Sequence, residues 1–447
     1  MSEKSNLLLT FYGDDFTGST DAMESLCRNG VPAVLFLEVP SAQRLAQFDG
    51  LRAIGVAGNS RSKSPDWMSE NLPPIFEALK ELGAPVCHYK VCSTFDSAPH
   101  TGSIGRAIDI GADIFSSACV PVIVGAPSLR RYQTFGNLFA GFGSAIYRID
   151  RHPVMSAHPI TPMHEGDLRL HLGQQTDRSI DLLDIAEILG EDYCDCDSRL
   201  RANGAQVLFY DVADKESSAR AGELLWRSAQ EAPVFCAGSS GVEYGLVEYW
   251  RRSGHIAPDD EPAHLRSEVD KLFVMSGSCS PLTERQILSA LDAGFVGRQI
   301  SPITLLDPDR QESEVETVIA DVVAELEAGK SVVAYTALGA PTQEEQELQA
   351  RDPHKFSDQL SSILARIFRE VLKRSKIGRA IVSGGDTSSG VVAEMGIYAL
   401  SMIAPAAPGA PLCRVHAEEG TFDGMEIVLK GGQMGTDNFF EEIRRSN

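Results

Sequence analysis

The chain has 447 residues, enough for two or three domains that each bury a core without disulfides or metal ions. Its apolar fraction of 43% and charged fraction of 23% are those of an ordinary soluble globular protein. A formal net charge of -22 argues against nucleic acid and anionic membranes as routine partners, because both attract clusters of Lys and Arg.

The cysteine pattern and the first residues bear on where the protein is found. The nine cysteines are dispersed and include no C-x-x-C pair, which is typical of reduced thiols buried as small hydrophobes. Residues 1–6 are polar and lack a signal-peptide pattern, and no apolar run reaches the roughly 18 residues needed to span a bilayer. We therefore expect a cytoplasmic protein.

Short apolar runs alternate with helical patterns along the chain, which predicts an α/β fold with mainly parallel sheets flanked by helices. A strand over residues 6–12 is followed by a break at 13–18 and a helix over 19–28. The later strands predicted in this half cover residues 31–37, 53–56, 86–90, 120–124 and 207–211.

Residues 251–270 are predicted to be a linker, because Gly, Pro and acidic residues replace the apolar periodicity. After it the α/β pattern restarts, and two of its helices have clear i, i+3, i+4 apolar spacing. The predicted elements are a strand over 272–275, helices over 280–293, 315–326 and 360–372, and a strand over 380–383. We predict two domains, residues 1–250 and 271–447.

Two places in the first domain combine a strand end with charged residues. Gly13–Gly18 contains the adjacent carboxylates Asp14 and Asp15, which could bind substrate hydroxyls, hold Mg²⁺ through water or take a proton. An Asp in this position could equally cap a helix. Lys90, followed by Ser93 and Thr94, ends another strand and could bind a carboxylate or phosphate, or be an exposed edge residue.

The second domain has three loops rich in glycine and hydroxyl groups. Such loops at helix N-termini offer free amides to phosphate oxygens, and adjacent glycines let a ligand approach the backbone. Asp386 could orient a metal ion or act as a base. Any of these segments could also be a simple tight turn. They are Ser276-Gly277-Ser278, Gly384-Gly385-Asp386-Thr387 and Lys430-Gly431-Gly432 with Gly435.

Several standard motifs are absent. The chain has no G-x-x-x-x-G-K-[ST], no G-x-G-x-x-G and no H-E-x-x-H, which disfavours P-loop, dinucleotide-binding and zincin proteins. Residues 151–171 contain four His, but their spacing and three prolines match no common metal site. A loop near the substrate and a structural connector both remain open for this segment, and we assign it no metal.

Together these pieces resemble the four-carbon acid-sugar kinase family. They occur in the family's order and cover nearly the whole chain. The matching segments are Gly13–Gly18 with Asp21, Lys90 with Ser93-Thr94, residues 151–168, Ser276-Gly277-Ser278 with Thr283 and Gln286, Gly384-Gly385-Asp386-Thr387, and Lys430–Gly435.

The resemblance implies an N-terminal substrate-binding domain, a C-terminal nucleotide-binding domain and an active site in the cleft between them. It implies ATP-dependent phosphorylation of acids such as threonate, erythronate or their 3-oxo relatives. It assigns Asp14, Asp15, Thr17, Lys90, Ser93, Thr94 and Arg151 to the substrate, and Ser276, Gly277, Ser278, Gly384, Gly385, Asp386, Thr387, Lys430, Gly431, Gly432 and Gly435 to ATP.

One departure from the family pattern affects the expected substrate. Family members that act on tetronates commonly continue the Ser-Thr motif with an Arg-Gly-Asn segment, whereas Thr94 is followed here by Phe95 and Asp96. A branched or oxidised acid such as an oxo-isoapionate is therefore a candidate substrate. Arg130, Arg131 or Arg151 could supply the missing positive charge.

Phosphoryl transfer depends mainly on positioning and charge neutralisation. We expect Mg²⁺ to arrive with ATP, and we consider Asp15, Asp14 and Asp386 as candidates for the base. A homodimer is compatible with the sequence. Two other functions stay open: a metal-dependent hydrolase or aldolase centred on His152, His158 and His164, and a non-catalytic sugar-acid-binding protein.

Overall fold

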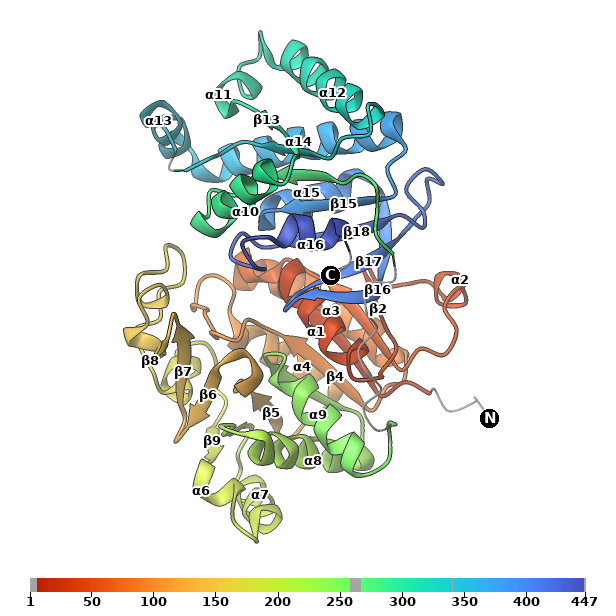
Figure 1. Cartoon of the computed structure of the whole chain (residues 1–447). Helices are drawn as coiled ribbons and strands as arrows, with labels where there is room; N and C mark the ends of the chain where they lie inside the picture. Colours follow the sequence, from red (N-terminus) through yellow and green to blue (C-terminus); the bar gives the residue numbers. More distant parts are fainter. Residues whose placement is uncertain (1–5, 258–266, 340, 446–447) are drawn as a thin grey trace. The chain divides into compact units, whose positions relative to one another are not determined.

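The computed structural model of the chain describes residues 6–257, 267–339 and 341–445. The chain divides into two compact units, residues 1–260 and 261–447 (Figure 1). The central part of the predicted 251–270 linker lies outside the described residues, which omit 258–266.

The first unit is built on a sheet of parallel strands in the order β2-β3-β1-β4-β11-β5-β10-β9. These strands are β1 (Leu9–Gly13), β2 (Ala33–Phe36), β3 (Ala53–Ala57), β4 (Val86–Lys90), β5 (Val120–Ile123), β9 (Ile180–Leu183), β10 (Val207–Tyr210) and β11 (Val234–Gly238). Its helices are α1 (Phe16–Cys27), α2 (Ala42–Leu45), α3 (Pro65–Glu81), α4 (Ile104–Phe115), α5 (Leu168–Leu172), α6 (Ile185–Ile188), α7 (Tyr193–Ala202), α8 (Lys215–Glu231) and α9 (Gly241–Arg252).

Strands β1, β2, β4 and β11 are buried at every position, as expected for parallel strands covered by helices on both faces. Because the strands run in one direction, their carboxyl ends lie at one edge of the sheet. Gly13 is in register with both Ala57 and Lys90, and Lys90 with Gly238. The residues that follow β1, β3, β4 and β11 therefore lie close together.

A small antiparallel sheet follows β5 and consists of β6 (Arg131–Thr134), β7 (Asn137–Phe142) and β8 (Ala145–Arg148) (Figure 1). Between β8 and α5 the chain forms two short 3-10 turns, Ile149–Arg151 and Met155–Ala157, and otherwise irregular structure. This is the proline- and histidine-containing segment of the sequence analysis, where an ordered loop was expected.

The second unit has its own sheet in the order β13-β14-β12-β15-β18-β17-β16, parallel except for the antiparallel pairs made by β17. Its strands are β12 (Phe273–Ser276), β13 (Val296–Gln299), β14 (Val332–Tyr335), β15 (Arg379–Ser383), β16 (Ile397–Ala407), β17 (Ala410–Ala417) and β18 (Glu426–Lys430). Its helices are α10 (Pro281–Asp292), α11 (Pro302–Leu305), α12 (Gln311–Glu327), α13 (Gln343–Arg351), α14 (Pro353–Ser375), α15 (Gly385–Glu394) and α16 (Phe439–Arg445).

The predicted α/β class, with a mainly parallel sheet in each unit, is confirmed. Two predicted boundaries are wrong in the same way, because segments expected to be loops begin helices. Thr17 and Gly18 lie in α1, and Asp386 and Thr387 lie in α15. In the first case the side chain of Asp15 caps the helix, and in the second Gly384, with φ 131°, turns the chain from β15 into α15.

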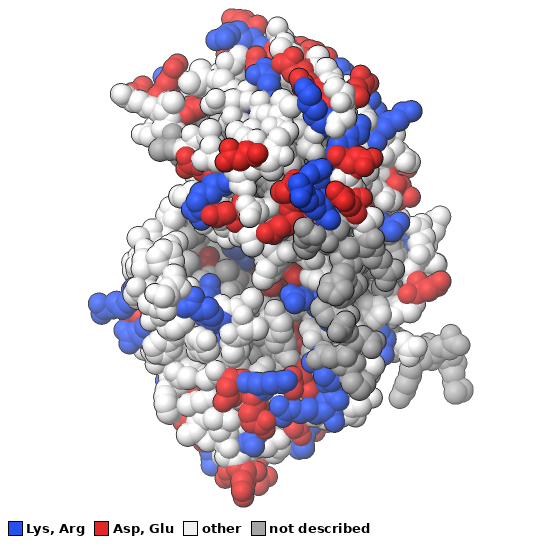
Figure 2. All heavy atoms as spheres, viewed as in Figure 1, with Lys and Arg blue, Asp and Glu red and all other residues white. Residues whose placement is uncertain are grey.

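Among the described helices, none is both long and apolar enough to cross a membrane. Lys and Arg are interspersed with Asp and Glu on the face shown in Figure 2, in both units, despite the net charge of -22. The negative charge is therefore not gathered into one acidic surface on that face.

Candidate active site

Carboxylates and cations meet where the central strands of the first unit end. Asp14 follows β1 and is only 3% exposed, and Arg61, in the turn after β3, donates from Nε to its Oδ2 at 3.1 Å and from Nη2 to its Oδ1 at 2.6 Å. The same Nη2 donates to Oδ1 of Asp15 at 2.6 Å. Lys90, the last residue of β4, pairs with Oδ2 of Asp21 at 3.4 Å. These five residues are called the strand-end cluster below.

Gly18 lets this cluster form. Asp15 caps α1 by accepting the backbone N–H of Gly18 at 2.9 Å. A Cβ atom added at Gly18 would lie 2.5 Å from Oδ1 of Asp15 and 3.1 Å from Nζ of Lys90. The glycine is needed because no side chain fits between the carboxylate and the ammonium group. Thr17 lies half-buried in the same helical turn.

The charges of the cluster depend on one another. Burial raises the pKa of Asp14 to about 6, against the opposing effect of Arg61. Burial alone would lower the pKa of Lys90, but the carboxylates of Asp21 and Asp15 raise it above its ordinary value. Lys90 is therefore a permanently charged group in a buried position. The side chain of Asp15 is 28% exposed, against 4% for Asp14, so Asp15 is the more accessible carboxylate.

The loop after β4 places a fourth carboxylate, that of Asp96, near this cluster. Thr94 is buried and donates from Oγ1 to Oδ1 of Asp96, whose Oδ2 accepts from Thr161 at 3.4 Å. Burial would raise the pKa of Asp96, but Arg61 and the hydrogen bond from Thr94 together lower it. Asp96 is thus an ionised carboxylate at 7% exposure. Ser93 lies half-buried in the same loop.

Of the expected substrate-binding residues, Arg151 is the one that the structure does not bring to this cluster. Its side chain is 78% exposed, and its Nε pairs with Oδ2 of Asp150 at 3.2 Å. In the described residues we find no ion pair between Arg151 and the carboxylates of the strand-end cluster. Arg61 is the member that sequence reasoning missed. Arg61 could have been found from its position, because it lies in the turn after the predicted strand 53–56. Asp14 and Lys90 were selected because they too lie at the ends of predicted strands.

Two histidines of the 151–171 segment use their rings to support the backbone. Nδ1 of His152 accepts from the amides of Val154 and Met155, both at 3.2 Å, and Nδ1 of His158 accepts from the amide of Thr161 at 3.1 Å. His164 is exposed. Over the described residues, no three His, Cys, Asp or Glu side chains are grouped as a metal ion would need.

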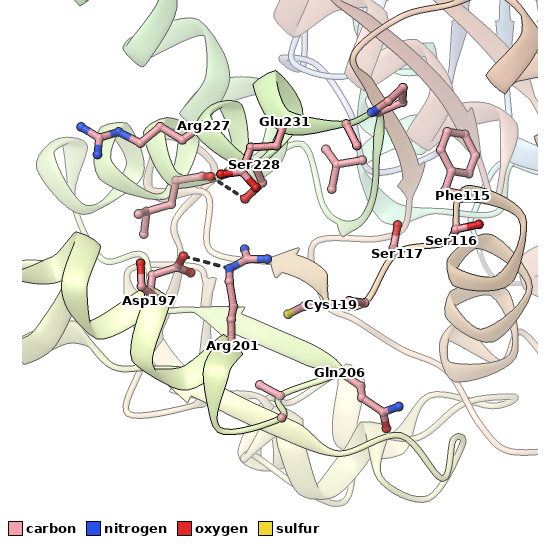
Figure 3. Close-up of a pocket in the computed structure, with 18 of the residues that line it drawn as sticks. Phe115, Ser116, Ser117, Cys119, Asp197, Arg201, Gln206, Arg227, Ser228 and Glu231 are labelled. Atoms are coloured by element: carbon pink, nitrogen blue, oxygen red, sulfur yellow. Dashed lines mark hydrogen bonds and ion pairs between the residues drawn. The ribbon is translucent and has the colours of Figure 1, made fainter.

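The first unit also has a cavity of about 820 Å³ at the opposite edge of its sheet (Figure 3). It is lined by residues at the amino ends of β5, β10 and β11, including Cys119, Gln206 and Arg201. Arg201 already donates to Asp197 at 2.8 Å and to the hydroxyl of Tyr210 at 2.7 Å. We do not place the substrate there, because ligands of parallel α/β sheets collect at the carboxyl edge and this cation has its partners.

The second unit has a cavity of about 270 Å³ at the carboxyl ends of its strands. One side is polar and consists of the predicted loop residues. The other side is apolar and comes mainly from α14. The polar residues are Gly277, Ser278, Gly384, Gly385, Asp386, Thr387 and Gly432, and the apolar residues include Pro302, Phe356, Leu360 and Leu364. A cavity with one apolar and one glycine-rich side fits a nucleobase and its phosphates.

Lys430 lies buried below the polar side, with 1% of its surface exposed. Its Nζ donates to Oγ of Ser383 at 2.9 Å and lies 5.9 Å from the centre of the Phe440 ring. Burial lowers the pKa of Lys430 to about 7. Ser276, at the end of β12, is also buried, and its Oγ has no hydrogen-bond partner. The ammonium group of Lys430 and the hydroxyl of Ser276 could both donate hydrogen bonds to a bound anion.

Helix α10 fixes the loop that carries Gly432. Thr283 and Ser280 both donate to the carbonyl of Gly432, at 2.9 and 2.6 Å, and Gln286 donates to the carbonyls of Met434 and Thr436. Gly431 and Gly435 are not among the residues that line the cavity. Sequence reasoning found the glycines but missed the apolar side, because α14 has the spacing of any core-facing helix.

The comparisons with known proteins agree with this division of the chain. Residues 9–246 match a family model described as a sugar-binding N-terminal domain, and residues 273–440 match one described as a nucleotide-binding C-terminal domain. The chain is 44% identical to a 3-oxo-isoapionate kinase of Paraburkholderia graminis over 98% of its own length and 94% of that protein's. It belongs to the four-carbon acid-sugar kinase family. The expectation from the sequence motifs is confirmed.

More distant proteins are similar along the whole chain as well. A 3-oxo-tetronate kinase of Burkholderia multivorans is 28% identical over 98% of this chain and 97% of its own. Among solved structures, a Haemophilus influenzae protein matches with a TM-score of 0.75 and 25% identity over 97% of this chain and 99% of that one. A Salmonella typhimurium LT2 protein, with a TM-score of 0.79 and 24% identity over 98% of both chains, shares the fold.

Proposed function

We propose that this sugar-acid kinase phosphorylates a hydroxyl of a branched, oxidised acid of the 3-oxo-isoapionate type, using Mg·ATP. The observation that carries the proposal is the loop after β4. Asp96, held ionised by Arg61 and Thr94, stands in the segment where tetronate-type members have an Arg. A carboxylate there repels the carboxylate of a linear tetronate and can instead accept hydrogen bonds from hydroxyl groups.

The identity figures support the same substrate. The chain is 44% identical to the 3-oxo-isoapionate kinase and 28% identical to the 3-oxo-tetronate kinase compared above. Both values cover almost the whole chain, so they reflect the entire protein and not one shared domain. This chain therefore groups with the branched-acid enzyme.

We assign the strand-end cluster to the acceptor. Lys90 and Arg61 would neutralise the transferring phosphoryl group, and Asp14 would hold Arg61 in place through two hydrogen bonds. Asp15 would accept the proton of the attacking hydroxyl, since it is the more accessible carboxylate. Ser93 and Thr17, both half-buried, would offer hydroxyl hydrogen bonds, whereas the hydroxyl of Thr94 already donates to Asp96.

We assign the cavity of the second unit to ATP. The amides of Gly385 to Thr387 at the start of α15 would bind phosphate oxygens, with Lys430 below them, and Phe356 and Leu360 would contact the base. Asp386 is exposed in that first turn, and it accepts a hydrogen bond from Ser357. A carboxylate beside phosphates suits Mg²⁺, which would neutralise charge on the phosphates. The expected cleft between the domains, the cytoplasmic location and the homodimer stay predictions.

A coupled ADP-release assay tests the substrate. The panel holds 3-oxo-isoapionate, threonate, erythronate and the 3-oxo-tetronates, each with Mg·ATP. We expect kcat/KM for 3-oxo-isoapionate to exceed that for any linear acid by at least about tenfold, the effect of one misplaced charge. A linear tetronate as the best substrate would refute the proposal.

A further inference from the structure

The arginines around the small sheet β6-β7-β8 differ in whether their charge is matched. Most of them have partners that account for their position. Arg148 and Arg151 pair with Asp150 at 2.6 and 3.2 Å, Arg169 pairs with Asp167 at 2.6 Å, and Arg130 donates to the carbonyls of Gly143 and Ala145 at 2.6 and 3.1 Å.

Neither Arg130 nor Arg131 has a carboxylate within ion-pair distance in the described part of the chain, but of these five arginines only Arg131 also has a buried nitrogen without a hydrogen-bond partner. Its Nη1 donates to the backbone carbonyls of Leu129 and Arg130 at 3.1 and 3.3 Å. Its Nε is buried and has no hydrogen-bond partner. Burial, reinforced by Arg130, lowers the pKa of Arg131, which is the effect of an uncompensated cation. A half-buried guanidinium without an anion is costly unless a ligand supplies one.

The backbone places Arg131 at the edge of the sheet that carries the strand-end cluster. Arg131 exchanges two backbone hydrogen bonds with Ala126, at 2.9 and 3.1 Å, in the loop after β5. Strand β5 neighbours β11, which neighbours β4. Arg131 and the strand-end cluster therefore follow neighbouring strands at the same carboxyl edge of the sheet.

A second unmatched donor lies near Arg131. Because Nδ1 of His152 accepts two backbone amides, the ring proton is on Nε2. This Nε2 is buried without a hydrogen-bond partner of good geometry, although the carbonyl of Gly141 lies beside it. Burial and Arg131 keep the ring neutral, since both lower its pKa. Arg131 pairs with Ala140 and Ala140 with Tyr147, whose ring centre lies 6.2 Å from that of His152, so the two donors belong to one region of the small sheet.

We propose that Arg131, with Nε2–H of His152 beside it, binds the carboxylate of the sugar acid in this kinase. This inference rests on the proposed function and deepens it. Asp96 repels a carboxylate in the segment where tetronate-type members have an Arg, so the acid group needs a cation elsewhere at the same edge. Arg131 offers planar donors that match a carboxylate, whereas Arg130 and Arg151 are already occupied.

The test compares kinetics of Arg131→Met, Arg131→Lys and the control Arg151→Met on two acceptors. The first acceptor is 3-oxo-isoapionate, and the second is its analogue with the carboxylate reduced to a hydroxymethyl group. Arg131→Met should raise KM for the acid about 10- to 100-fold, as expected for a lost charge-assisted hydrogen-bond pair, and leave KM for Mg·ATP within about twofold. On the reduced analogue it should equal wild type. Arg131→Lys should recover part of the loss, and Arg151→Met should behave as wild type.

Two results would overturn the inference: an unchanged KM for the acid in a folded Arg131→Met protein, or equal losses on both acceptors. Thermal unfolding of each variant separates loss of binding from loss of fold. If the wild-type protein turns over neither acid, kinetics cannot test the site. In that case, calorimetric titration of wild type and Arg131→Met with 3-oxo-isoapionate and threonate measures binding directly. Arg131-dependent binding there would refute the proposed substrate but support the carboxylate site, and Arg131-independent binding would refute both.

Discussion

Asp15 is distinguished from Asp14 by which of its oxygen atoms are occupied. Both oxygens of Asp14 accept from Arg61, whereas Oδ1 of Asp15 takes the hydrogen bonds from Arg61 and Gly18. No hydrogen bond reaches Oδ2 of Asp15 from the described residues, so this oxygen can accept one from a substrate hydroxyl. The geometry therefore favours Asp15 as the base and Asp14 as the group that positions Arg61.

Asp15→Asn should lower kcat by about 10²- to 10⁴-fold, the usual contribution of a general base, and change KM for ATP only slightly. Asn is as good a helix cap as Asp, so the melting temperature should stay close to that of wild type. Steady-state kinetics of Asp15→Asn beside Asp14→Asn decides between the two. Near-normal turnover in Asp15→Asn would remove it as the base.

Lys430 combines a functional charge with a cost in stability. Its pKa is lowered from 10.5 to about 7, so between these pH values the unfolded state binds more protons and stability rises with pH. Below pH 7 the folded protein carries the full cost of the buried charge.

Lys430→Met should therefore be more stable than wild type by roughly 1–3 kcal/mol near pH 6, with the difference shrinking towards pH 10. It should also weaken ATP binding at least about tenfold, because the buried cation below the phosphates is lost. Thermal unfolding at pH 6 and pH 10, with calorimetric ATP titration, measures both. A variant that is less stable at pH 6 and binds ATP normally would show that Lys430 is only a packing residue.

At the scale of elements, the start of α15 is the feature most specific to ATP. A Cβ atom at Gly385 meets nothing within 4 Å, so this glycine is not required by packing. It lines the cavity of the second unit, and its absent side chain leaves the backbone open to a ligand.

Gly385→Ala should keep or slightly raise thermal stability, since Ala favours a helix by about 1 kcal/mol over Gly, yet raise KM for ATP several-fold by blocking phosphate approach. Gly378→Ala is the matched control, because its Cβ would also meet nothing and it lies outside the cavity lining. Equal KM values for the two variants would argue against phosphate binding at this turn.

The elements that the sequence predicted best are those whose signal is local. Strand β4 was predicted at its observed bounds, 86–90, a run of mainly apolar residues that ends at a charged Lys. The small sheet β6-β7-β8 was not predicted, because its half-exposed strands lack the continuous apolar run that marks a buried strand. For the site, adjacent carboxylates and glycines could be read from the sequence. Arg61 follows a predicted strand, but its role depends on which strand ends are neighbours, and the unmatched charge of Arg131 depends on contacts that the sequence does not show.

For the whole molecule, each unit has its own sheet and its own hydrophobic core. The two ligands are therefore expected to stabilise different parts of one chain. The cavity of about 820 Å³ at the amino edge of the first unit's sheet is the alternative place where the sugar acid could bind (Figure 3). The test of the account must therefore distinguish this cavity from the strand-end cluster.

The most direct test of this account is hydrogen–deuterium exchange of the wild-type protein with each ligand alone. We predict that 3-oxo-isoapionate slows exchange at residues 13–18, 58–62 and 90–96, and that Mg·ATP slows it at 276–280, 384–388 and 430–434. Ligand binding protects a site by shifting local opening equilibria, so the map reports the binding region without any substitution. Protection by the acid at residues 116–119 and 201–206, with none at 13–18, would contradict the account.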